Sequence, residues 1–153
     1  MRPVILISFA TLACTACGQV SEDQGEVSQS GQIDQVEVGT ILYPDIERFE
    51  IYGASCAYAE GTSLGAKVIA RNEDAFMKLD GEVIRLAADP GAGELPYGSR
   101  SAYASDAYLL YLAIEGEGRQ SGEEVLEYAG TVELRDRVGE VIYEARGAAQ
   151  CGV

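Results

Sequence analysis

The side chains that could do acid–base or nucleophilic chemistry are unevenly represented in this sequence of 153 residues. It has no histidine, 25 aspartates and glutamates, and 11 lysines and arginines. Without histidine the chain lacks the commonest general base, the commonest metal ligand and every Ser-His or Cys-His nucleophile pair. With so many carboxylates, any single pair suited to glycoside hydrolysis is uninformative. We therefore expect a noncatalytic protein that uses no cofactor.

Two of the four cysteines, Cys14 and Cys17, end a short apolar run that follows Arg2. The run is too short to span a bilayer as a helix, which needs about 20 residues. A basic start, a short apolar core and small residues before a cut site are typical of an export signal. The segment Leu12-Ala13-Cys14-Thr15-Ala16-Cys17-Gly18 resembles the lipobox of bacterial lipoproteins.

This resemblance implies a signal peptide over residues 1–16 and a lipid on Cys17, with Cys14 as the alternative. An ordinary secretory signal is the other interpretation. In the lipoprotein family an Asp soon after the lipidated cysteine retains the protein at the inner membrane, whereas Gly18 and Gln19 stand here. The resemblance therefore implies an outer-membrane protein that faces the periplasm and contacts the membrane only through its lipid anchor.

The other two cysteines, Cys56 and Cys151, are 95 positions apart. In an oxidising compartment such a pair is typical of one disulfide. Closing a loop of this length would stabilise the fold by roughly 4–5 kcal/mol in the chain-entropy model. Two free thiols or a metal pair are the alternatives, although the sequence offers no obvious further metal ligands.

Residues 17–45 are rich in Gln, Ser, Gly, Glu and Asp. Such a stretch buries too little apolar surface to offset the entropy of ordering, so we expect a flexible acidic tether. Residues 46–153 then form the folded domain. Their short apolar runs separated by turn residues predict an all-β fold of about seven strands, a small antiparallel barrel or sandwich.

The clearest local signal in this domain is Asp80-Gly81 between two apolar runs. Both residues tolerate the positive φ of a tight turn, so residues 76–79 and 82–86 should pair as a hairpin. Residues 103–114 favour a strand but leave a helix open, and so do residues 122–129, where Ser121 and Glu124 have the spacing of a capping box. We prefer strands over 125–135 and 140–145, joined by a turn at 136–139.

The segment 89–101 contains three glycines and two prolines, which exclude regular structure. Long loops in compact domains are often functional, so we expect this one to bind a partner. Tyr103 borders the loop and is the tyrosine we expect to be exposed, whereas Tyr108 and Tyr111 should pack on the sheet. The carboxylates of 89–94 and 115–118 lie beside glycines and suggest calcium only weakly, because neither loop has the EF-hand spacing.

The order of these motifs resembles the membrane-bound inhibitors of C-type lysozyme. Cys56 and Cys151 match the frame of that family, and residues 78–86 resemble its hairpin. Ser99-Arg100-Ser101-Ala102-Tyr103 has the Ser-to-Tyr spacing of its binding loop, and Tyr111 begins the strand that leads to Glu115-Gly116. The resemblance implies a β-barrel that inserts Ser99 into the lysozyme cleft, with Arg100 and Tyr103 beside it.

Two positions depart from the pattern of the family. Arg100 stands in place of Gly, and Glu115 stands in place of the Lys that reaches a catalytic carboxylate of lysozyme, which Glu115 would repel. The net charge of −14 suits a basic protein as partner and disfavours nucleic acid. We expect an envelope lipoprotein that binds a basic protein such as a lysozyme-like hydrolase. A structural lipoprotein without a ligand, or a domain that binds a small ligand or calcium, is the alternative.

Overall fold

The computed structural model describes residues 36–153, which form one helix, one 3-10 turn and nine strands. The predicted signal peptide over 1–16, the lipidated cysteine and the part of the predicted tether over 17–35 lie outside the described residues. In chain order the elements are β1 (Val38–Gly39), α1 (Tyr43–Phe49), β2 (Ser55–Glu60), β3 (Ala66–Ala70), β4 (Asp74–Leu79), β5 (Glu82–Ala88), the 3-10 turn η1 (Pro96–Gly98), β6 (Ala102–Ala104), β7 (Tyr108–Gln120), β8 (Val125–Asp136) and β9 (Val141–Gly152).

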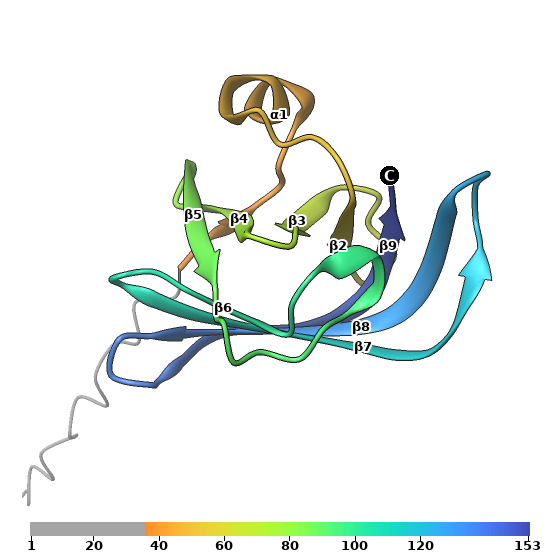
Figure 1. The fold of residues 1–153 in the computed structure, drawn as a ribbon. Coiled ribbons are helices and arrows are strands. Elements are labelled where there is room, and N and C mark those ends of the chain that lie inside the picture. The colour runs from red at the N-terminus through yellow and green to blue at the C-terminus, as the bar shows by residue number, and fades with distance from the viewer. Residues whose placement is uncertain (1–35) are drawn as a thin grey trace, which may run out of the picture. The chain divides into compact units, whose positions relative to one another are not determined.

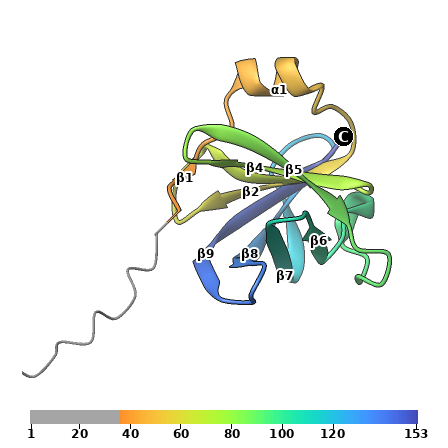
Figure 2. The ribbon, with the colours of Figure 1, turned by 90° about the vertical axis from the view of Figure 1, so that its left-hand side faces the viewer.

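Strands β2 to β9 close into an antiparallel barrel (Figures 1 and 2). Each strand pairs with the next along the chain, and β9 returns to pair with β2. This confirms the all-β prediction. The barrel has one strand more than the seven expected because the apolar block 103–114 is broken by a turn, in which the Ser105 N–H donates to the Tyr108 carbonyl at 2.9 Å.

The predicted hairpin is confirmed. Asp80 and Gly81 have φ values of 50° and 83°, as a tight two-residue turn requires, and Leu79 pairs with Glu82. Asp80 also holds the start of the domain. Its backbone N–H donates to the Glu37 carbonyl at 2.9 Å, and its Oδ1 accepts from the Glu37 N–H at 3.0 Å. Strand β1 is thereby aligned beside β4.

The domain begins before residue 46, which corrects the boundary predicted for the tether. Residues 38–39 pair with β4, and residues 43–49 form helix α1, where we expected a flexible tether up to residue 45 and β structure after it. Pro44 lies in the first turn, where its missing N–H removes no intrahelical bond. Asp45 accepts a hydrogen bond from the Leu42 N–H at 2.9 Å and pairs with Lys78 of β4. These contacts bind α1 to the barrel despite its short length.

Side chains fill the interior of the barrel. Inward residues alternate with outward ones, as along β8, and Tyr58, Met77, Leu86, Leu110 and Leu134 are fully buried. A second cluster of Ile41, Ile51, Ile69 and Phe76 lies outside the barrel wall, with Ile46 of α1 packed against it. Of the residues described, the seven of α1 form the one α-helix, and no helix in this range has the length and apolar character to cross a membrane.

The predicted disulfide is confirmed. Cys56 of β2 and Cys151 of β9 are register partners, both fully buried, and their sulfurs are bonded. The bond joins the first and last strands of the barrel, so it locks the seam at which the barrel closes.

Candidate functional site

The loop over 89–101 is irregular, as predicted, but it is fixed to the barrel. It contains the 3-10 turn and an isolated bridge between Glu94 and Arg100. Within it the Leu95 N–H donates to the Ser99 carbonyl at 2.8 Å. The Tyr97 hydroxyl donates to the Glu124 carbonyl at 3.1 Å, which ties this loop to the turn between β7 and β8. The loop is therefore held in place by hydrogen bonds within it and by its bond to the β7–β8 turn.

Ser99 is fully buried, which does not fit the partner-binding role predicted for it. Its hydroxyl donates to the Pro96 carbonyl at 2.8 Å and lies 3.3 Å from the Cys56 sulfur. The 3-10 turn folds the loop inward at this point, so Ser99 packs against the disulfide. A partner would have to unfold the turn to reach it.

Tyr103 is also buried, with 1% of its surface exposed, so the expectation that it is exposed is wrong. Its position on β6 points it into the barrel, where its hydroxyl donates to the Arg71 carbonyl at 2.7 Å and accepts from the Arg100 N–H at 2.6 Å. Of the three predicted contact residues, only Arg100 retains partial exposure, and its guanidinium donates to the Asn72 side chain at 3.0 Å. Tyr111, expected to pack, is 42% exposed.

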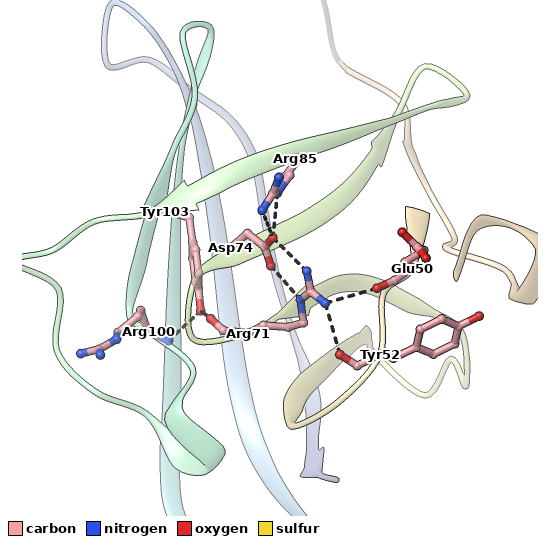
Figure 3. A network of polar contacts seen from close by, with 7 residues as sticks. All are labelled: Glu50, Tyr52, Arg71, Asp74, Arg85, Arg100 and Tyr103. Carbon is pink, nitrogen blue, oxygen red and sulfur yellow. Dashed lines mark hydrogen bonds and ion pairs between the residues drawn. The ribbon is translucent and has the colours of Figure 1, made fainter. Parts of the chain in front are cut away.

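A buried carboxylate organises the neighbouring polar network (Figure 3). Asp74, 1% exposed at the start of β4, accepts from the Arg71 guanidinium at 2.7 and 2.9 Å. Arg85 of β5 donates to the same carboxylate at 2.7 Å. Burial alone would raise the pKa of Asp74, but the hydrogen bonds from Arg71 and Arg85 outweigh it, and the pKa is lowered. Asp74 is therefore ionised at neutral pH.

Arg71 connects this network to the segment that follows α1. Its Nη1 donates to the backbone carbonyls of Glu50 at 3.4 Å and Tyr52 at 3.2 Å, and its guanidinium lies 5.1 Å from the centre of the Phe76 ring. Figure 3 shows the Tyr52 ring directed away from the network while its carbonyl faces Arg71. Arg71 thus fixes the backbone that carries the Glu50 and Tyr52 side chains.

Beside this network is an open hollow of about 460 Å³, lined by Phe49, Glu50, Arg71, Phe76, Val83 and Arg85. Two guanidinium groups face one buried carboxylate, so the wall formed by Arg71 and Arg85 has an excess of positive charge. Glu50, at the end of α1, lines the same hollow.

A group of exposed carboxylates lies in the distal part of the β7–β8 hairpin, residues 115–124. Figure 1 shows this end of the hairpin curving away from the body of the barrel. Its register shifts between Glu115 and Arg119, and its exposed carboxylates belong to Glu115, Glu117, Glu123 and Glu124. Arg119 is paired with Glu127, so it does not neutralise those four groups.

Neither loop considered for calcium shows the geometry of a metal site. Asp89 uses its Oδ1 to accept from the Gly91 N–H at 2.8 Å, which makes it part of a turn. Within residues 36–153 no group of three or more His, Cys, Asp or Glu side chains is placed to hold a metal ion.

Sequence reasoning missed Arg71, Asp74 and Arg85. The available signal was Asp74 itself, because an acidic residue that opens an otherwise apolar run is expected to need a cationic partner if the run is buried. The identity of that partner depends on the β4–β5 register, which places Arg85 next to Phe76. Comparison of the chain with family models, with characterised proteins and with solved structures gave no match in any of the three.

Proposed function

We propose that this chain is a noncatalytic lipoprotein of the bacterial envelope whose barrel binds a basic protein, with a lysozyme-like hydrolase as the candidate partner. The lipobox-like segment before Cys17 and the net charge of −14 support the proposal. The barrel core is filled with side chains, so recognition falls to the outer surface.

The observation that carries the proposal is the set of exposed carboxylates on the β7–β8 hairpin. Glu115, Glu117, Glu123 and Glu124 are exposed, and they belong to the end of the hairpin that curves away from the barrel (Figure 1). The backbone of that segment is held by the Tyr97 bond to Glu124 and by the pairing of Val125 with Gly152. Carboxylates grouped on one segment attract a basic partner over long range and favour its orientation on contact.

The mode of contact differs from that of the lysozyme inhibitors to which the sequence has a resemblance. With Ser99 packed on the disulfide, the loop 89–101 has no projecting serine to insert into a cleft. Glu115 would also repel the catalytic carboxylates of a lysozyme. The proposal is therefore binding to the basic outer surface of the hydrolase, with its active site left accessible.

The anchor is tested separately from the binding domain. Cys17→Ser should abolish the incorporation of radiolabelled palmitate in cells, whereas Cys14→Ser should retain it. The reverse result would show that Cys14 is the lipidated residue. Labelling that survives both changes would contradict the lipoprotein assignment.

Binding is tested by calorimetric titration of the full chain with a C-type lysozyme, using two variants of equal charge. The first changes Glu115, Glu117, Glu123 and Glu124 to Gln. The control changes four exposed carboxylates elsewhere, Glu82, Glu94, Asp106 and Glu140, to the corresponding amides. If the hairpin is the docking element, the first variant should lose about tenfold or more in affinity and the control about twofold or less. Absence of any binding would favour a structural lipoprotein without a ligand.

A further inference from the structure

Large apolar and aromatic side chains are exposed on and around α1. Leu42, Tyr43, Phe49 and Tyr52 are between 38% and 67% exposed, although they fall within eleven residues. Patches of this kind on an otherwise charged surface are typical of interaction sites. The segment is not a loose end, because α1 is bound to β4 through Asp45 and Lys78. The patch is thus presented on a fixed support.

Two carboxylates share this face with two phenol rings. Tyr43, Glu47 and Glu50 are spaced at four and three residues, so they lie along one side of the helix and its end. Tyr52 follows two residues later, and its pKa is raised, first by partial burial and then by Tyr43, Glu47 and Glu50. Arg48 is directed elsewhere, with its guanidinium 5.3 Å from the centre of the Phe49 ring.

The backbone at Glu50 is held in a conformation that a residue with a side chain rarely adopts. Its φ is 52°, the left-handed region that usually selects glycine at the end of a helix. Arg71 holds the Glu50 and Tyr52 carbonyls in this geometry. A strained residue at a fixed position is a reason to look for a role of its side chain.

We propose that the face formed by Tyr43, Glu47, Glu50 and Tyr52 binds the lysine or arginine side chains of a basic protein. A cation over a tyrosine ring gains cation–π attraction, and the carboxylates pair with its charge.

This inference rests on the proposed function for its partner, and the experiment separates the two. The full chain, labelled with ¹⁵N, is titrated with a short capped peptide of alternating glycine and arginine, and with the same peptide carrying citrulline. The arginine peptide should shift the amide resonances of Tyr43, Glu47, Glu50 and Tyr52, and the uncharged peptide should not. Equal shifts from both peptides, or none at these residues at about 1 mM peptide, would overturn the inference whatever lysozyme does.

Substitutions then identify which side chains contact the arginine peptide. Tyr43→Ala with Tyr52→Ala should weaken binding of the arginine peptide by about tenfold, whereas the two Tyr→Phe changes, which keep the rings, should leave it within about twofold. Tyr111→Ala, an exposed tyrosine on β7, is the matched control and should have no effect. If lysozyme binds the parent and the Tyr43/Tyr52 alanine variant equally, this face is not its docking site, and the hairpin proposal stands without it.

Discussion

The hydroxyl of Tyr103 donates a hydrogen bond to the backbone carbonyl of Arg71 at 2.7 Å, and this bond joins the end of the 89–101 loop to the Arg71–Asp74–Arg85 network. The same hydroxyl accepts from the Arg100 N–H at 2.6 Å. One buried phenol therefore satisfies one backbone group between β3 and β4 and one in the 89–101 loop. Tyr103, which the sequence suggested as a partner-contact residue, therefore stabilises the fold instead.

Tyr103→Phe is expected to lower the free energy of unfolding by about 1–3 kcal/mol, because it leaves the Arg71 carbonyl and the Arg100 N–H without their shared partner. Urea denaturation followed by circular dichroism measures the change. Tyr111→Phe, at a 42% exposed position, is the matched control and should change stability by less than about 0.5 kcal/mol. If the two variants have the same free energy of unfolding, the hydrogen bonds of the Tyr103 hydroxyl do not stabilise the fold.

Asp74→Asn is expected to destabilise the domain by roughly 3 kcal/mol, since it leaves two guanidinium groups around a site with no negative charge. The pH dependence has a definite sign. Because the folded-state pKa of Asp74 is lowered, its contribution is complete above about pH 5 and is lost as the pH falls below about 4. When the parent and Asp74→Asn are denatured across this pH range, the free energy of unfolding should fall less steeply with decreasing pH in the variant. Asp106→Asn, an exposed carboxylate, serves as control.

Tyr58→Phe is expected to leave the domain as stable as the parent or about 1 kcal/mol more stable. The Tyr58 hydroxyl is buried and has no hydrogen-bond partner among the described residues, so its removal eliminates an unpaired polar group.

Ionisation of Tyr58 is also expected to lower the stability of the domain at high pH. Burial, with a further contribution from Glu60, raises the pKa of Tyr58 to about 12, whereas an unfolded tyrosine ionises near 10. The folded state therefore holds the proton more tightly, and stability falls as the pH rises between these values. Tyr58→Phe should reduce the difference in unfolding free energy between about pH 9 and pH 11. An unchanged difference would show that the pKa of Tyr58 is not raised in the folded domain.

Glu50→Gly is expected to stabilise the domain by about 0.5–1 kcal/mol, because glycine adopts the φ of 52° at the end of α1 without a side-chain clash. If the α1 face binds cationic side chains, the same change should weaken binding of the arginine peptide. Thermal unfolding and the peptide titration measure the two effects on one sample. A variant that gains stability and keeps full binding would show that the Glu50 side chain has no part in recognition.

The features that sequence predicted well depend on local chemistry. Asp80-Gly81 fixes its hairpin because two adjacent residues with positive φ permit few other conformations. Cys56 and Cys151 were the two cysteines left to pair within the folded part, and the strand preference of Tyr103 to Ile114 held except at the turn near Ser105.

The features that it missed depend on contacts between distant parts of the chain. Helix α1 has seven residues, too few for a periodic pattern, and it is held by Lys78, which is 33 residues from Asp45. Ser99 lies within the glycine- and proline-rich loop, and Tyr103 follows it. Such a composition indicates that the chain turns, but it does not indicate which way the side chains face. Their burial comes from the 3-10 turn and the closure of the barrel.

Calorimetric titration of a C-type lysozyme with the full chain, in parallel with the variant in which Glu115, Glu117, Glu123 and Glu124 are Gln, tests the central claim most directly. We expect saturable binding by the parent that weakens with added salt, and a loss of about tenfold or more in the hairpin variant. Undetectable binding by the parent, or equal affinities for the parent and the hairpin variant, would contradict it.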